Sequence, residues 1–160
     1  MEFIINRDIF LKSIGHASGI VEKKTTLPIL SNILIEAKNS KIKITATDLD
    51  IIYSEEIAVK SLIKEGTTTT SASILYDILR KLESNSDVKL SLQSSNKLNL
   101  ISGNSKFNLL CLSADNFPLS DEDIKQKPFE VPSQKLLNLL NKTKISISND
   151  ETRHYLNGIY

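Results

Sequence analysis

The chain has 160 residues, of which 40% are hydrophobic and 24% are charged, with five glycines and four prolines. This composition is typical of a globular protein and excludes a collagen-like or wholly disordered chain. Twenty Lys and Arg against nineteen Asp and Glu give a net charge of +1, so no bulk positive charge indicates nucleic-acid binding. Any such binding has to come from the local placement of basic side chains.

The first residues are not expected to form a targeting signal. Met1-Glu2-Phe3-Ile4-Ile5-Asn6 has no basic region and no long apolar run, and no later apolar run approaches the length of a membrane span. The single cysteine, Cys111, lies in an apolar run and cannot form an intrachain disulfide, which agrees with a reducing compartment. We therefore expect a cytoplasmic protein with no membrane partner and a buried, inert Cys111.

A strand followed by an amphipathic helix is predicted three times. The three units span residues 3–18, 67–82 and 129–142. In each, apolar residues recur three and four positions apart after a short extended run, which is the spacing of one helix face. The apolar residues that share a face are Phe10, Leu11, Ile14 and Ala17 in the first unit, Ile74, Leu75, Ile78, Leu79 and Leu82 in the second, and Leu136, Leu137 and Leu140 in the third.

Strands separated by turns follow the first two units. Alternation of polar and apolar residues is strict over residues 41–47 and clear over residues 88–92. The remaining predicted strands are residues 32–37, 51–60, 97–101 and 106–112. Each half therefore reads strand-helix-strand-strand-strand. Two such halves predict an internally duplicated α+β fold with its helices on one face of antiparallel sheets.

Residues 115–127 are acidic, contain Pro118 and lose all periodicity, which indicates a linker. After them Phe129 matches Phe3, and Asn157-Gly158-Ile159 matches Asn32-Ile33-Leu34. We therefore predict a first domain over residues 1–126. Residues 127–160 are expected to be the start of a second copy that stops after its helix and the beginning of its next strand.

Several motifs, in order and at matching spacing, resemble those of the bacterial sliding clamp, the β subunit of DNA polymerase III. They are Thr26-Leu27-Pro28-Ile29-Leu30-Ser31-Asn32, Thr45-Ala46-Thr47-Asp48-Leu49-Asp50, Phe117-Pro118 and Asp150-Glu151-Thr152-Arg153-His154-Tyr155-Leu156-Asn157-Gly158. The resemblance runs the whole length of the chain. It implies the DNA clamp fold and a non-catalytic processivity factor without a cofactor. In that family, three domains per chain and two chains form a ring around duplex DNA, which tethers the polymerase.

The resemblance also implies which residues contact DNA. Clamps hold duplex DNA through basic side chains on the polar sides of their helices, without reading its sequence. The candidates are Lys12, Lys23, Lys24, Arg80 and Lys81. Arg80 and Lys24 stand where clamps commonly carry a basic residue. The alternative for each is an exposed side chain that serves only solubility.

Two partner surfaces follow from the same resemblance. The edge strand around Lys106, Phe107 and Leu109 corresponds to the subunit interface, although Phe107 and Leu109 could instead be core residues. Arg153, Tyr155 and Leu156 correspond to part of the pocket that binds peptide motifs of polymerases and clamp loaders, and the alternative is a strand entering a core. Because the chain matches one domain and the start of another, we do not expect it to form the homodimeric ring by itself.

One alternative activity comes from the acidic residues Asp48, Asp50, Glu55 and Glu56, since paired carboxylates bind Mg²⁺ in nucleases. A metal-dependent phosphodiesterase would use Asp48 and Asp50. His16 and His154 are too isolated to indicate a metal site or a catalytic base. A third hypothesis is a folded remnant without activity.

Overall fold

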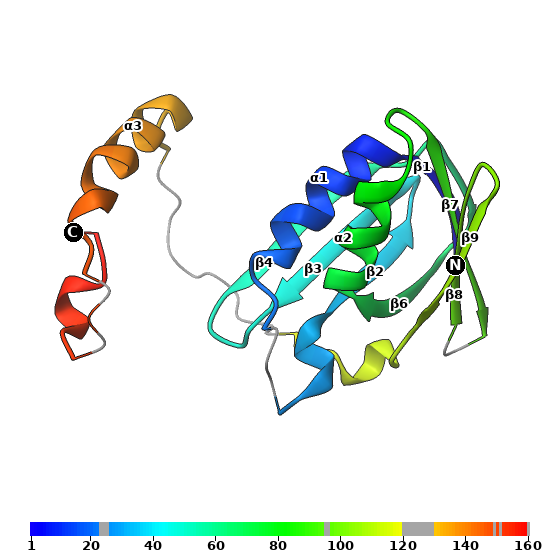
Figure 1. The fold of residues 1–160 in the computed structure, drawn as a ribbon, viewed down its shortest axis with the longest axis horizontal. Helices are drawn as coiled ribbons and strands as arrows, with labels where there is room; N and C mark the ends of the chain where they lie inside the picture. The colour runs from blue at the N-terminus through cyan, green and yellow to red at the C-terminus, as the bar shows by residue number, and fades with distance from the viewer. Residues whose placement is uncertain (23–25, 95–96, 120–129, 149, 151, 160) are drawn as a thin grey trace. The chain divides into compact units, whose positions relative to one another are not determined.

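The computed structural model describes residues 1–22, 26–94, 97–119, 130–148, 150 and 152–159 (Figure 1). The chain divides into two compact units, Met1–Ser120 and Asp121–Tyr160, which are described separately. The predicted domain boundary after residue 126 lies outside the described residues. No helix within the described ranges is both long enough and apolar enough to cross a membrane.

The first unit contains nine strands and two α-helices among its described residues. In chain order they are β1 (Glu2–Asn6), α1 (Arg7–Ser18), β2 (Asn32–Lys38), β3 (Lys41–Thr47), β4 (Ile52–Ala58), β5 (Ser61–Lys64), β6 (Gly66–Ser71), α2 (Ala72–Lys81), β7 (Asp87–Ser94), β8 (Lys97–Ser102) and β9 (Ser105–Leu110). Short 3₁₀ helices, η1 (Pro28–Ser31) and η2 (Ala114–Asn116), precede β2 and follow β9.

The strands form two antiparallel sheets, ordered β5-β1-β7-β8-β9 and β4-β3-β2-β6. The first strand of each half lies in the sheet of the other half, because β1 pairs with β7 and β6 pairs with β2. This exchange joins the two halves into one body. Figure 1 shows α1 and α2 side by side on one side of the sheets, and the main hydrophobic core includes side chains from both helices and both sheets. The predicted duplicated α+β clamp fold is confirmed.

Both helices begin at a capping side chain. The Asn6 side chain accepts hydrogen bonds from the backbone amides of Asp8 and Ile9, and the Ser71 hydroxyl accepts one from Ile74. Such caps satisfy amide groups that have no partner within the helix. Each helix then buries one apolar face, with Phe10, Ile14 and Ala17 in α1 and Ala72, Leu75 and Leu79 in α2. The opposite faces stay available for other contacts.

Two strand predictions need correction. The strand predicted over residues 51–60 ends at Ala58, and the short strand β5 after it, which pairs with β1, was not predicted. The strand predicted over residues 106–112 ends at Leu110. Beyond it the chain leaves sheet β5-β1-β7-β8-β9, because the backbone of Leu112 bonds instead to the side chain of Thr69 on β6.

The second unit contains α3 (Ser133–Thr143) and the 3₁₀ helices η3 (Lys144–Ser146) and η4 (His154–Leu156). The four leucines of α3, Leu136, Leu137, Leu139 and Leu140, are all exposed. The strand expected to begin near Asn157 is not formed, and this part of the prediction is wrong. A strand needs a neighbour for its backbone hydrogen bonds, and the described residues of this unit provide no other strand.

Candidate nucleic-acid interface

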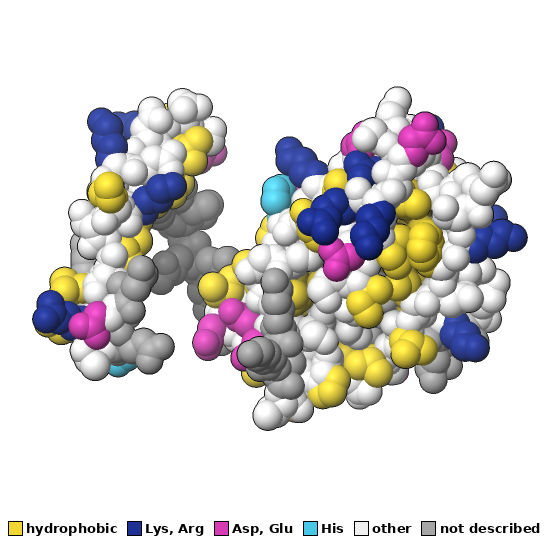
Figure 2. All heavy atoms as spheres, in the orientation of Figure 1, with side chains coloured by type: hydrophobic (Ala, Val, Ile, Leu, Met, Phe, Trp, Pro, Cys, Tyr) yellow, Lys and Arg dark blue, Asp and Glu magenta, His cyan; other side chains and the backbone are white. Residues whose placement is uncertain are grey.

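The solvent-facing side of α1 and α2 carries exposed basic side chains. Lys12 lies on α1, and Arg80 and Lys81 form the last turn of α2. Figure 2 shows Lys and Arg side chains gathered over the two helices. The predicted contacts Lys23 and Lys24 lie outside the described residues. The remaining three basic candidates therefore come from two helices that pack side by side.

A shallow groove of about 390 Å³ runs along the two helices. It is lined by Asp8, Leu11, Lys12, Gly15, His16 and Tyr76. The helices approach closely here, because a Cβ atom added to Gly15 would lie 3.2 Å from the Tyr76 ring. The groove therefore presents a narrow concave strip with Lys12 and His16 on one wall.

Arg80 forms an ion pair with Asp77, whose carboxylate lies 3.5 Å from the guanidinium. Both side chains are about 60% exposed, with values of 62% and 61%. An ion pair at such an exposed site contributes little because water and salt screen it. The pair leaves Arg80 free to exchange Asp77 for a phosphate oxygen at small energetic cost.

A hydrogen-bonded cluster fixes α1 against β4. The hydroxyls of Ser13 and Tyr53 both donate to the same Glu55 oxygen at 2.5 Å, and His16 Nδ1 lies 3.3 Å from the Tyr53 hydroxyl. The hydrogen bond from Ser13, followed by that from Tyr53, lowers the pKa of Glu55. Burial, reinforced by the hydrogen bond to Glu55 and its charge, raises the pKa of Tyr53 to about 12. The cluster holds Glu55 as an anion turned toward α1.

This cluster predicts a late-titrating tyrosine. Of the four tyrosines in the chain, Tyr53 should ionise near pH 12, and the step should be absent in Tyr53→Phe. Because its pKa in the folded chain is raised above 10.0, the stability it contributes is present below pH 10 and is lost as the pH rises through 12. In Glu55→Gln the pKa of Tyr53 should move part of the way back toward 10, because the charge of Glu55 is gone while the burial of Tyr53 remains. Phenolate absorbance measures this directly, and an unchanged step in Glu55→Gln would contradict it.

Of the carboxylates proposed for a phosphodiesterase, Asp48 already has a structural role. One oxygen of Asp48 accepts hydrogen bonds from the backbone amides of Asp50 and Ile51, so this side chain stabilises a turn. Glu55 and Glu56 are consecutive residues of β4 and point to opposite faces. Within the ranges that the structure describes, no group of three or more His, Cys, Asp or Glu side chains is placed to hold a metal ion.

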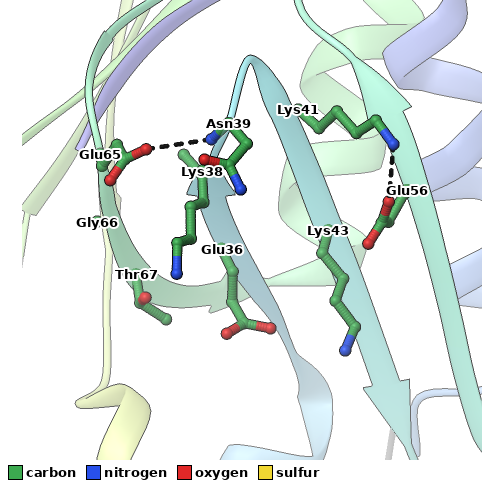
Figure 3. A pocket seen from close by; sticks show the side chains of 10 residues that line it. Glu36, Lys38, Asn39, Lys41, Lys43, Glu56, Glu65, Gly66 and Thr67 are labelled. Carbon is green, nitrogen blue, oxygen red and sulfur yellow. Dashed lines mark hydrogen bonds and ion pairs between the residues drawn. The ribbon is translucent and has the colours of Figure 1, made fainter.

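A hollow of about 630 Å³ lies on the other face of sheet β4-β3-β2-β6. Figure 3 shows side chains of both charges around it, with the Lys41 ammonium 3.2 Å from Glu56 and with Lys43 beside Glu36. Three lysines and three glutamates line it, so the lining of this hollow has no net charge. It provides matched control positions for the helix-borne lysines and arginine.

The predicted subunit interface is corrected at one residue. β9 is an edge strand of its sheet, as expected. Leu109 is only 4% exposed and belongs to the hydrophobic core, whereas its neighbour Leu110 is 79% exposed. Successive residues of a strand face opposite ways, so Phe107 and Leu109 lie on the same, inward face, where Phe107 is partly buried. Lys106, Asn108 and Leu110 are the exposed side chains on the open face.

The predicted peptide-pocket residues lie together in the second unit. Tyr155 and Leu156 belong to η4 and line a shallow pocket of about 330 Å³ with Lys142, Thr143 and Ile159. Arg153 precedes η4 and pairs with Asp150 at 3.4 Å. The three residues are exposed rather than part of a strand entering a core.

Arg7 is the residue near this interface that the sequence did not single out. It is the first residue of α1, and its side chain is only 9% exposed. Its guanidinium donates to the carbonyl oxygens of Leu79 and Arg80 at the end of α2. No local sequence pattern predicts this contact, because Leu79 and Arg80 lie more than seventy positions after Arg7 in the sequence.

Residues 1–121 match the family described as the DNA polymerase III beta subunit, N-terminal domain. The whole chain is 39% identical to the beta sliding clamp of Caulobacter vibrioides, and 99% of it aligns at 36% identity with that of Buchnera aphidicola. It spans 43% of the length of both relatives.

Solved structures agree with these matches. The DnaN sliding clamp of Bartonella birtlesii superposes with a TM-score of 0.93 at 41% identity, over all of this chain and 42% of that one. That of Pseudomonas aeruginosa gives 0.92 at 30% identity, over 99% of this chain and 42% of that one. Sequence and fold thus agree that the chain belongs to the family of the bacterial DNA polymerase III β subunit, the beta sliding clamp.

Proposed function

We propose that this chain forms part of a ring that encircles duplex DNA and tethers a DNA polymerase, without catalysing a reaction itself. In this proposal residues 1–126 are the first clamp domain and residues 127–160 begin the second. The family membership supports the proposal, and the exposed basic side chains on α1 and α2 carry it. A protein that acts on a bacterial chromosome works in the cytoplasm, and the proposed activity belongs to that compartment.

Lys12, Arg80 and Lys81 suit loose contact with the DNA backbone. Long basic side chains on a helix surface reach phosphate oxygens without touching base edges, so they hold any sequence equally and allow sliding. With a net charge of +1, the chain gains only a few such contacts. We expect weak duplex binding that decreases gently as salt rises. Lys23 and Lys24 are proposed as further contacts of the same kind.

Further partners are proposed for the complete protein. The β9 edge, with Lys106 and Phe107 from the sequence prediction and Leu110 from the structure, is the proposed surface for a second subunit, because an edge strand presents unpaired backbone groups. Arg153, Tyr155 and Leu156 are proposed as part of a pocket for peptide motifs of the polymerase and the clamp loader. The exposed tyrosine and leucine beside a shallow pocket support this proposal.

A salt titration of duplex binding tests the DNA interface. Each phosphate contact contributes about 0.9 to the slope of the logarithm of affinity against the logarithm of salt concentration. The double variant Arg80→Ala/Lys81→Ala should therefore bind more weakly and lose about 1 to 2 from the magnitude of that slope. Fluorescence anisotropy with a labelled duplex, starting at low salt, measures both quantities.

The matched control is Lys41→Ala/Lys43→Ala, which removes the same charge from the other face of sheet β4-β3-β2-β6. It should leave the slope close to that of the unsubstituted chain. Equal slopes for the two double variants would contradict the proposed interface. Strong preference for one DNA sequence would contradict it as well, because phosphate contacts carry no sequence information.

A further inference from the structure

The end of α2, which bears Arg80 and Lys81, is held by the beginning of α1. Arg7 Nε donates to the Leu79 carbonyl at 2.6 Å, and Nη2 donates to the Arg80 carbonyl at 2.9 Å. The last carbonyl groups of a helix lack partners within it. The planar guanidinium gives the Arg80 carbonyl a donor and the Leu79 carbonyl a second one beside the Leu82 amide, and its positive charge also suits the negative end of the helix dipole.

Arg7 is itself held in place. Its Nη1 donates to Asp8 at 2.7 Å, and the second oxygen of Asp8 accepts a hydrogen bond from the Asn85 amide at 2.8 Å. The backbone amide of Arg7 also donates to the Ser86 carbonyl. The start of α1, the end of α2 and the loop that leads to β7 thus form one connected set of hydrogen bonds.

We infer that Arg7 is a positioning residue for DNA binding: it fixes the last turn of α2 so that Arg80 and Lys81 face the duplex together. The inference rests on the proposed function. Arg7 contacts no DNA itself, because its side chain is only 9% exposed and each of its three guanidinium nitrogens donates to a protein acceptor. Arg7 affects DNA binding only by setting the direction in which Arg80 and Lys81, the two exposed side chains after Leu79, extend.

Arg7→Lys tests this inference because it leaves the net charge unchanged. A lysine ammonium is a point charge and cannot hold two carbonyl groups in the fixed geometry of a guanidinium. In the 160-residue chain, the variant should lose about 1 to 2 from the magnitude of the salt slope, as if one or both contacts were gone. If Arg7 served only folding, Arg7→Lys would lower the melting temperature, but the folded variant would keep the same salt dependence of DNA affinity.

A double-mutant cycle makes the test specific. In the background of Arg80→Ala/Lys81→Ala, Arg7→Lys should cause no further loss of affinity, because the side chains that it positions are gone. An equal loss in both backgrounds would overturn the inference. If Arg7→Lys does not fold by circular dichroism, Arg7→Met takes its place in the same cycle. Its straight apolar chain removes the hydrogen bonds without placing a charge at the buried position, and because it also removes one positive charge and the Asp8 ion pair, only the cycle is interpreted for this variant.

The outcomes separate the two proposals. If Arg80→Ala/Lys81→Ala flattens the slope and the Arg7 variant does not, the inference fails and the proposed function stands. If Arg80→Ala/Lys81→Ala binds DNA like the unsubstituted chain, the proposed function fails first and the inference fails with it. If both variants flatten the slope and the cycle is not additive, both proposals are supported.

Discussion

Replacing Phe10 by alanine should lower the free energy of unfolding of the first unit by about 3–5 kcal/mol. Phe10 is fully buried on α1, and its ring meets that of Phe3 on β1 edge to face, with centroids 6.3 Å apart. Truncation removes this aromatic contact and leaves a cavity that closely packed neighbours cannot fill. Because natural domains are stable by only about 5–15 kcal/mol, the variant should be near its unfolding midpoint at moderate temperature.

Ile9→Ala is the matched control, since Ile9 precedes Phe10 on the same helix and is exposed. Its effect should stay within about 0.5 kcal/mol, as for most surface substitutions. Urea denaturation followed by circular dichroism gives both values. Similar losses for the two variants would show that α1 does not pack through the face that contains Phe10.

Thr69→Val should cost about 1–3 kcal/mol, although valine has nearly the shape of threonine. The Thr69 hydroxyl donates to the Leu112 carbonyl at 2.8 Å and accepts hydrogen bonds from the Leu112 amide and the Asn32 side chain, both at 3.2 Å. Valine leaves these groups without their partner at a buried position. Since the hydroxyl connects β6 with the segment that follows β9, its loss weakens the junction between the two sheets.

Thr67→Val provides the comparison, because Thr67 lies on the same strand and is exposed. It should change the free energy of unfolding by no more than about 0.5 kcal/mol. Hydrogen exchange adds a local readout, in which the Leu112 amide should lose protection in Thr69→Val alone. Equal protection of that amide in both variants would contradict the role assigned to the hydroxyl.

The sequence predicted the helices well because their signals are local. Asn6 caps α1 within three residues, and the apolar period of residues 7–18 continues without interruption to the observed end of the helix. The same holds for α2, where Ser71 precedes a regular apolar face. The fold class followed from the order of these elements, since repeated strand-helix units and alternating strands allow few arrangements.

The pairing of strands depends on distant residues and was not predicted. Nothing near β1 indicates that it pairs with β7, more than eighty residues later in the sequence. The short strand β5 has no alternating pattern of its own and is defined only by its pairing with β1. In β9, Leu109 and Leu110 are adjacent and equally apolar, so the sequence could not tell which of them faces the core.

Prediction of the candidate interface was limited in the same way, because contacts between distant parts of the sequence could not be foreseen. Exposed basic residues on predicted helices could be assigned from periodicity and family resemblance, because both depend on positions within one element. The buried Arg7 could not, since an arginine in the first turn of a helix normally lies in solvent. Its burial results from the end of α2, which only the folded chain brings to it.

A heteronuclear NMR titration of the 160-residue chain with short duplex DNA at low salt tests the central claim most directly. Amide shift changes should concentrate on the exposed faces of α1 and α2, around Lys12, Arg80 and Lys81, and should be the same for two duplexes of unrelated sequence. Lys41 and Lys43, on the other face of sheet β4-β3-β2-β6, should stay unchanged. Shift changes centred on Lys41 and Lys43, or changes that depend on the DNA sequence, would contradict it.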